Sequence, residues 1–325
     1  MLRLGILVGC LVTTIEARQR FIVLGDWGSE EIAKVAPHML GEVDSDTEAV
    51  LLLGDNFYPV GTSNANDPQF ASIYQVPFQH FPPHLPFQVI AGNHDYYSNI
   101  QSQLTFTNRD RRWYFPSLYY SRAYGKVLTI NLDTYGLVGG ESNFGGTVVS
   151  DREQLLWIEN ELKTRAHLFD WVVVMGHYPI YSCNEGSDTI ALENELFPLL
   201  VKYKVDLYLS GHIHLQQHVE KLGVNMFVSG NGARYIPRAQ CQLGVNRDQA
   251  NVLLFTENSF GFIVLDFTSH LLQAKFHRIS IDGSEHSVVY EMEAVRMHKL
   301  PEQPRAKYSY SLRQSLLNRL RTNRP

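Results

Sequence analysis

Short apolar runs recur along the chain, and most of them stop at a glycine that is followed by a polar side chain. Each run is too short for a typical buried helix, and its apolar residues are continuous rather than alternating, which is typical of a strand covered on both faces. We therefore predict buried strands at residues 21–24, 49–53, 87–91, 127–132, 171–175 and 205–209.

Amphipathic helical patterns lie between these runs. The first spans residues 29–43 and opens at Ser29, a residue type that caps helices. The second spans 150–164, where Ser150 and Glu153 have capping-box spacing, and the third spans 189–203. Strands that alternate with helices predict an α/β fold. Further strands, with few helices between them, are predicted at 225–230, 261–267, 271–279 and 287–295.

The chain ends differ in character from the segment between them. A positive start, an apolar stretch at residues 4–12 and a plausible cleavage site at Ile15-Glu16-Ala17 predict a signal peptide at 1–17; a buried first strand or an uncleaved anchor is the alternative. We predict one domain at 18–300 and a basic, solvated tail at 301–325. The signal peptide implies the secretory pathway, with secretion or a lysosome-like or vacuole-like compartment as the destination.

Composition excludes few classes of protein. Of the 325 residues, 44% are hydrophobic and 19% are charged, which is ordinary for a globular chain. A formal net charge of -5 with interspersed signs gives no indication of nucleic-acid binding, and no apolar run is long enough to span a bilayer. We expect a monomer. Cys183 and Cys241 follow the predicted signal peptide, and both a disulfide and two separate thiols fit their positions.

Polar side chains with oxygen or nitrogen lone pairs follow five of the first six runs. A glycine at each of these ends allows a sharp exit and a close approach of neighbouring chain. Because ligands bind at the carboxyl ends of strands in α/β sheets, we expect these side chains to meet. They are Asp26, Asp55 and Tyr58, Asn93 and His94, His177, and His212 and His214.

These donors predict a metal site. Carboxylates, a phenolate, an amide oxygen and imidazoles suit borderline-to-hard transition ions rather than a thiolate zinc site. Without His94 there are seven donor residues, more than one ion needs, whereas two ions that share a carboxylate would use them all. Taken singly, Asp26 or Asn93 fits a turn, and His177 fits a buried histidine with hydrogen-bond partners. Their joint occurrence favours a shared site.

The motifs "GDWG", "GDNFY", "GNHD", "GHYP" and "GHIH" together resemble the metallophosphoesterase superfamily, and within it the small, tartrate-resistant type of purple acid phosphatase. The resemblance implies two mixed β-sheets that pack face to face and are flanked by helices, so that residues 18–300 form a catalytic domain. Many members carry a histidine two residues after the first aspartate. Gly28 stands there, and Tyr58 has the position of the tyrosine ligand of purple acid phosphatases.

The same resemblance implies a cofactor and a reaction. One set of ligands is expected to hold Fe(III): Asp26, Tyr58, His214 and the bridging Asp55. A second set is expected to hold Fe(II), Zn(II) or Mn(II): Asp55, Asn93, His177 and His212. The implied activity is that of an acid phosphatase, which hydrolyses phosphate monoesters by attack of a hydroxide bound to the Fe(III)–M(II) pair.

Substrate contacts are also implied. Asn93 and His94 are expected to bind the phosphate, and His94 to donate a proton to the leaving oxygen; a purely structural role for His94 is the alternative. Glu185 is a further substrate-binding candidate, but Gly186 stands where the family has a second pocket histidine. Two other functions fit the same fold: a scaffold or binding protein with little or no turnover, and a phosphodiesterase or nucleotide hydrolase that uses the same metals.

Overall fold

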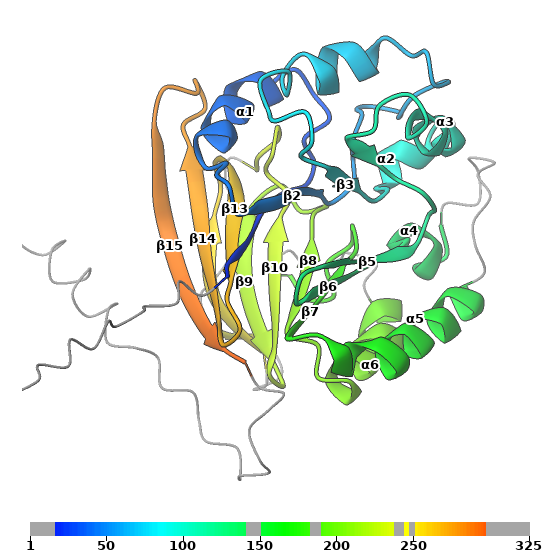
Figure 1. Cartoon of the computed structure of the whole chain (residues 1–325), viewed down its shortest axis with the longest axis vertical. Coiled ribbons are helices and arrows are strands. Elements are labelled where there is room, and N and C mark those ends of the chain that lie inside the picture. The colour runs from blue at the N-terminus through cyan, green and yellow to red at the C-terminus, as the bar shows by residue number, and fades with distance from the viewer. Residues whose placement is uncertain (1–16, 141–150, 183–189, 237–243, 247–250, 297–325) are drawn as a thin grey trace, which may run out of the picture.

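The computed structural model describes residues 17–140, 151–182, 190–236, 244–246 and 251–296, which form two β-sheets with flanking helices (Figure 1). The seven-stranded sheet has the order β15 (His286–Val295), β14 (Leu271–Ile279), β13 (Phe260–Phe267), β1 (Gln19–Leu24), β2 (Thr47–Leu52), β3 (Phe87–Val89) and β4 (Trp113–Tyr114). The eight-stranded sheet has the order β11 (Gly244–Asn246), β12 (Asn251–Glu257), β9 (Gln216–Lys221), β10 (Val224–Ser229), β8 (Leu207–Ser210), β7 (Trp171–Met175), β6 (Val127–Asn131) and β5 (Tyr120–Tyr124).

Both sheets are mixed. Strands β1 to β4 pair in parallel, and so do β6, β7, β8 and β10. The remaining strands pair antiparallel: β13, β14 and β15 in one sheet, and β5, β9, β11 and β12 in the other. The late strands predicted after residue 223 complete both sheets, because β13 pairs with β1 and β10 pairs with β8. The predicted fold class is therefore confirmed.

Helices occupy the connections. They are α1 (Ile32–Gly41), α2 (Asn93–Tyr96), α3 (Ile100–Phe106), α4 (Thr134–Leu137), α5 (Asp151–Arg165) and α6 (Phe197–Lys202), with short π- or 3-10 segments at Phe70–Gln75, Ala166–Leu168 and Leu192–Leu196. In Figure 1, α5 and α6 lie together at the lower right, and α1 lies at the top beside β13. Among the described residues, no helix has the length and apolarity needed to cross a membrane.

Alternate residues of the central strands enter two different cores. Phe21 and Val23 of β1 belong to a core that also contains Val173 of the opposite sheet, so this core lies between the sheets. Ile22 and Leu24 of the same strand belong to a second core, which includes helical residues. Side chains of a strand alternate between faces, and apolar runs become continuous when both faces are covered. This arrangement explains the sequence pattern.

The predicted elements are present with small shifts in their ends. The six predicted central strands match β1, β2, β3, β6, β7 and β8 to within two residues at either end. The role predicted for Ser29 is wrong: α1 begins three residues later, and the Ser29 hydroxyl donates to the carbonyl of Ala233. Strands β4, β5, β9, β11 and β12 were not predicted. Of these, β4 and β11 are short, and β9 is largely polar. Ser150, Cys183, Glu185, Gly186, Cys241, the predicted signal peptide before Ala17 and the predicted tail lie outside the described residues.

Candidate metal centre

The predicted donor residues follow neighbouring parallel strands of the two sheets. Strands β1, β2 and β3 are adjacent in one sheet, and β7 and β8 are adjacent in the other. Because each set is parallel, the carboxyl ends of its strands lie at one edge of the sheet. The two edges meet, and all seven predicted donors contact at least one other donor. The contacts are given below.

The hydroxyl of Tyr58 lies among three other predicted donors. It is 2.8 Å from Oδ2 of Asp55 and 2.9 Å from Oδ1 of Asp26. Its distance to Nε2 of His214 is 3.2 Å, and that nitrogen is 3.3 Å from Oδ1 of Asp26. The three strand ends after β1, β2 and β8 therefore converge at this oxygen.

A second point of convergence lies at Nε2 of His177. This atom is 3.1 Å from Oδ1 of Asn93 and 3.4 Å from Oδ1 of Asp55. His212 joins the group, because its Nδ1 is 3.2 Å from the same Asn93 oxygen. Its backbone N–H also donates to Oδ2 of Asp26 at 2.7 Å. Asp55 contributes one oxygen to each point, as a bridging carboxylate would.

The hydrogen-bond requirements at His177 indicate that a cation belongs there. The carbonyl of Leu53 can only accept, so the 2.8 Å contact places the proton of a neutral His177 on Nδ1. Nε2 then carries a lone pair that faces the oxygens of Asn93 and Asp55. Three lone pairs directed at one point repel unless a proton or a metal ion lies between them. The pKa of His177 responds accordingly: burial lowers it, but the charges of Asp55 and Asp26 raise it overall.

Burial shapes the ionisation of the anionic donors. Asp26 and Asp55 are almost fully buried, and their ion-pair partners among the described residues are histidines. Burial and the charge of Asp26 raise the pKa of Asp55, although His177 opposes the shift. Burial raises the pKa of Tyr58 well above its usual value, and both carboxylates add to this. Burial also opposes ionisation of Asp26, yet a hydrogen bond from His214 and the nearby imidazoles keep its pKa low.

This donor set fits a pair of transition ions. Two buried carboxylates and a phenol in mutual contact repel one another once ionised, and bound cations remove that cost. The nitrogen and oxygen donors are those expected for iron, zinc or manganese. Oxygen or nitrogen atoms of Asp26, Asp55 and His177 lie within 4.8 Å of one another, close enough to share ions.

The backbone at the strand ends adopts conformations that few residues accept. Asp26, Asp55 and His212 have positive φ angles of 57°, 53° and 68°. Such angles cost energy for residues other than glycine and cluster at functional sites. Gly92, before Asn93, is required for a different reason, since a Cβ atom there would overlap Oδ1 of Asp55.

The structure also explains why tyrosine replaces histidine in the donor set. A Cβ atom on Gly28 would lie 2.5 Å from the backbone carbon of Asn56, and the N–H of Tyr58 donates to the Gly28 carbonyl at 2.9 Å. This close packing leaves no room for an imidazole at residue 28. The Tyr58 hydroxyl occupies the position beside Asp26 instead.

Sequence reasoning missed a buried network that supports the donors. Asp95 accepts from the backbone N–H of Asn56 at 3.0 Å and of Gly92 at 2.8 Å, and from the side-chain amide of Gln103 at 2.8 Å. It thereby joins the loop after β2 to the loop after β3. Burial raises the pKa of Asp95 to about 7, and the charge of Asp55 adds to the shift. An aspartate within "GNHD" was visible in the sequence, but its partners were not.

His94 lies at the partly exposed side of the donors. Its Nδ1 donates to the carbonyl of Pro59 at 2.6 Å, and its backbone N–H donates to Oδ1 of Asp55 at 3.0 Å. The other ring nitrogen, Nε2, is 4.0 Å from Oδ2 of Asp55. The ring also packs edge-on against Tyr58, with centroids 4.6 Å apart. These contacts fix the ring and leave Nε2 facing the donor cluster.

Arg234 is a further residue that sequence reasoning missed. It is exposed, and its guanidinium carbon lies 3.9 Å from the centroid of the Tyr58 ring, a cation–π contact. Arg234 follows β10, an apolar strand that ends at Ser229 before Gly230. The glycine signal that identified the other strand ends was therefore present here as well.

Comparison with known proteins decides the family. The calcineurin-like phosphoesterase family matches residues 19–216. The chain belongs to this family. Tartrate-resistant acid phosphatase type 5 of Oryctolagus cuniculus is 33% identical over 280 residues, which cover 77% of this chain and 84% of that protein. Purple acid phosphatase 7 of Arabidopsis thaliana is 28% identical over 279 residues, which cover 81% of this chain and 83% of that protein. The family predicted from the strand-end motifs is confirmed.

Solved structures share this calcineurin-like phosphoesterase fold at lower identity. The Plasmodium protein GAP50, described as the anchor in the inner membrane complex, has a TM-score of 0.71 and 22% identity, and the match covers 87% of this chain and 90% of that chain. Purple acid phosphatase PPD1 of yellow lupin has a TM-score of 0.63 and 17% identity, with coverage of 90% and 58%. Both likenesses concern the fold alone.

Proposed function

We propose that this chain is an acid phosphatase that hydrolyses phosphate monoesters with an Fe(III)–M(II) centre. The observation that carries the proposal is the convergence of seven donor residues from five strand ends, with Asp55 shared between two points of convergence. The similarity of this chain to tartrate-resistant acid phosphatases, which reaches 33% identity with the rabbit protein, supports hydrolysis of phosphate monoesters at acid pH.

Two sets of residues would hold the ions. The Fe(III) set is Asp26, Asp55, Tyr58 and His214, and the M(II) set is Asp55, Asn93, His177 and His212. When bound, the metal pair supplies Lewis acidity and an activated nucleophile at acid pH. The positive φ angles at Asp26, Asp55 and His212 support this assignment, because strain of this kind persists where a site requires it.

His94 is proposed to transfer a proton. Its Nδ1–H is held by the carbonyl of Pro59, so protonation at Nε2 would leave that N–H directed toward the donor cluster. A leaving alkoxide needs a proton, and a partly exposed imidazole can supply it at acid pH and recover it from water.

Arg234 is proposed to bind the phosphoryl group. A guanidinium is well suited to phosphate oxygens because its donors are arranged in a planar fork. The 3.9 Å contact with the Tyr58 ring holds this charge beside the donors. Arg234 would thus provide positive charge near the substrate. In this chain Gly186 stands in place of the family's second pocket histidine, so that residue cannot provide it.

Purified full-length protein tests the proposal. Hydrolysis of p-nitrophenyl phosphate should be fastest at acid pH, stop after removal of metals with a chelator, and return when iron and zinc are added back. The Asp55→Ala variant should lose both metals and turnover, whereas His270→Ala, a change at an exposed histidine of the β13–β14 turn, should keep both. Phosphatase activity that survives chelation and the Asp55→Ala change would contradict the proposal.

A scaffold role is the second candidate, favoured by the similarity in fold to the Plasmodium anchor protein. Two bound metals without turnover on p-nitrophenyl phosphate, bis-p-nitrophenyl phosphate or a nucleotide would favour this role. Turnover on the diester or the nucleotide alone would instead indicate a phosphodiesterase or nucleotide hydrolase.

A further inference from the structure

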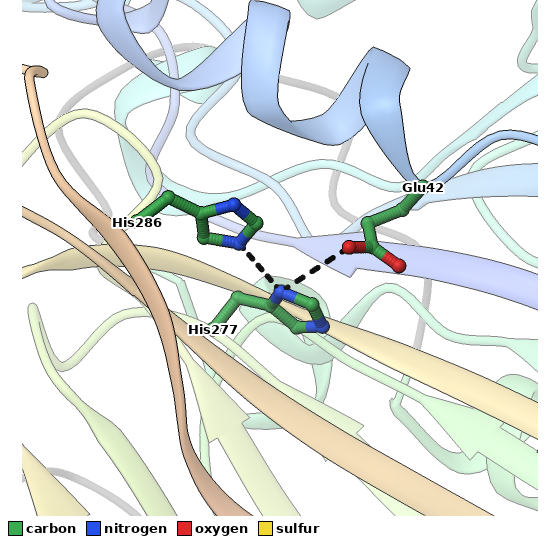
Figure 2. A group of neighbouring side chains, drawn as sticks. All are labelled: Glu42, His277 and His286. Atoms are coloured by element: carbon green, nitrogen blue, oxygen red, sulfur yellow. Dashed lines mark hydrogen bonds and ion pairs between the residues drawn. The ribbon is translucent and has the colours of Figure 1, made fainter.

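A second group of candidate ligands lies where α1 packs against the β14–β15 hairpin. Lys34, in the first turn of α1, contacts this hairpin, because its ammonium donates to the carbonyl of Ile281 at 3.1 Å. His38 contacts the carbonyl of Gly283 through Nε2 at 3.0 Å. Glu42 follows directly as the C-cap residue of α1, and its side chain points toward the strands (Figure 2).

Three ligand atoms meet at this junction. Nδ1 of His277 on β14 is 2.7 Å from Nε2 of His286 on β15 and 3.8 Å from Oε1 of Glu42. Figure 2 shows both partners directed at this one nitrogen, and the three ligand atoms lie within 4.8 Å of one another. None of these residues belongs to the centre described above, so the group is a separate site.

The two imidazole rings meet edge to edge. Their centroids are 4.9 Å apart, their planes differ by 27°, and the facing nitrogens are much closer than the centroids. The lone pairs of these nitrogens therefore lie near both ring planes and point into the space between the rings. Metal ligation by histidine uses this in-plane direction.

Packing holds the buried member of the pair. His277 is 1% exposed and stacks on Phe262, with centroids 4.5 Å apart and planes that differ by 14°. Burial also lowers the pKa of His277 to about 3, so its ring is neutral near pH 7. A buried, neutral and fixed imidazole is a preorganised ligand.

The other two ligands leave the site accessible. His286 is exposed, and the Glu42 side chain is 27% exposed. An ion can therefore enter from solvent and keep a water molecule as its fourth ligand. Two nitrogens on one tetrahedral Zn(II) lie ~3.3 Å apart, since each bond is ~2.0–2.1 Å. The present separation of 2.7 Å must therefore increase by about 0.6 Å, which the exposed side chain of His286 can accommodate.

We propose that Glu42, His277 and His286 bind a divalent transition ion, with Zn(II) as the best match. Two imidazoles and one carboxylate form a common zinc set, and Mg²⁺ or Ca²⁺ would prefer oxygen ligands. The bound ion joins the C-terminal end of α1 to the hairpin that includes β15, one of the two edge strands of its sheet. The simpler alternative is a hydrogen bond between two imidazoles that share one proton, without metal.

Zinc stoichiometry distinguishes a bound zinc ion from a metal-free hydrogen bond between the two imidazoles. Metal-free, full-length protein is dialysed against Zn(II), and zinc per chain is measured by mass spectrometry for the wild type, His286→Ala and Glu42→Gln. His270→Ala is the matched control, because it removes an exposed histidine at the other end of β14. We expect His286→Ala to bind one zinc fewer than the wild type, Glu42→Gln to bind it more weakly, and His270→Ala to match the wild type. Equal stoichiometry and affinity in all four proteins would overturn the proposal.

Thermal unfolding provides a second measurement that does not depend on phosphatase activity. A ligand that binds only the folded state raises the melting temperature, by an amount that grows with ligand concentration. The binuclear centre contributes the same zinc-dependent rise to every protein in the set. We therefore expect a smaller rise in His286→Ala than in His270→Ala. An equal rise in the two variants would contradict a zinc ion at this junction, whatever the outcome for the phosphatase proposal.

Discussion

The hydroxyl oxygen of Tyr58 lies 2.8 Å from Oδ2 of Asp55, in a region where both side chains are almost fully buried. Asp26 and His214 approach the same hydroxyl. Burial and the two neighbouring carboxylates disfavour a phenolate here, and together they raise the pKa of Tyr58. A trivalent cation reverses that preference, because its charge favours the ionised form of each oxygen donor.

Tyr58→Phe should therefore remove a visible absorption band from the iron-loaded protein. The band of a ferric site with a tyrosine ligand depends on the phenolate oxygen, which phenylalanine lacks. Tyr74→Phe is a matched control, since Tyr74 is also a buried tyrosine but has no hydrogen-bond partner among the described side chains and backbone. A band of unchanged intensity in the Tyr58 variant, at equal iron content, would mean that this residue is not a ligand.

The sequence predicted the central strands and the donor residues for one physical reason. Strands covered on both faces are continuously apolar, so the point where the apolar run stops marks the strand end and the polar residue placed there. Strand β9 lacks this signal because it is largely polar even where it is buried, and β15 shows it only weakly because much of the strand is exposed and carries polar residues. β9 was missed for this reason, while the late segment at β15 kept enough apolar residues to be recognised.

Other features depended on distant contacts that no local pattern reveals. The group of Glu42, His277 and His286 joins a helix end to a hairpin whose register pairs Ile279 with His286. Ser29 has a residue type suited to capping, but a tertiary contact with Ala233 uses its hydroxyl instead. Likewise, the positive φ angles of Asp26 and Asp55 were not predicted from the sequence, although aspartate accepts this conformation more readily than most residues.

Asp95→Asn should destabilise the protein and weaken metal binding. Asp95 accepts hydrogen bonds from Asn56, Gly92 and Gln103, and an asparagine would direct an N–H₂ group at some of these donors. A buried donor left without an acceptor costs about 1–3 kcal/mol. We expect a loss of about 2 kcal/mol in the free energy of unfolding, measured by denaturant titration, and a lower metal content at limiting metal. A variant as stable as the wild type would show that the network does not support the loops.

Arg234→Ala should raise KM for a phosphate monoester more than it lowers kcat. Arg234 is exposed and contacts the face of Tyr58, so its removal leaves no buried group unpaired. The lost charge–phosphate contact is worth about 1–2 kcal/mol, roughly 5–30-fold in kcat/KM. Arg234→Lys should recover part of the loss because the charge remains but the planar fork does not. Unchanged kinetics in Arg234→Ala would exclude the residue from substrate binding.

Asp133 should make the stability of the fold depend on pH. It is fully buried after β6 and accepts from the Tyr96 hydroxyl at 2.7 Å. Burial raises its pKa to about 6, although the hydrogen bond from Tyr96 opposes the shift. The folded state thus binds the proton more tightly than the unfolded chain, whose pKa is about 3.9. The resulting stabilisation amounts to at most roughly 3 kcal/mol. It is present below pH ~4 and is lost as the pH rises through about 6.

The Asp133→Asn variant should lack this dependence, because an amide does not ionise and can still accept from Tyr96. The melting temperature of the variant relative to the wild type should therefore rise between pH 4 and pH 7. Asp282→Asn is the control: hydrogen bonds from Ser280 and Ser284 lower the pKa of Asp282 to about 2. Its folded and unfolded pKa values both lie below pH 4, so its difference from the wild type should change little over this range. A constant difference for Asp133→Asn as well would mean that Asp133 titrates in the folded protein as it does in the unfolded chain.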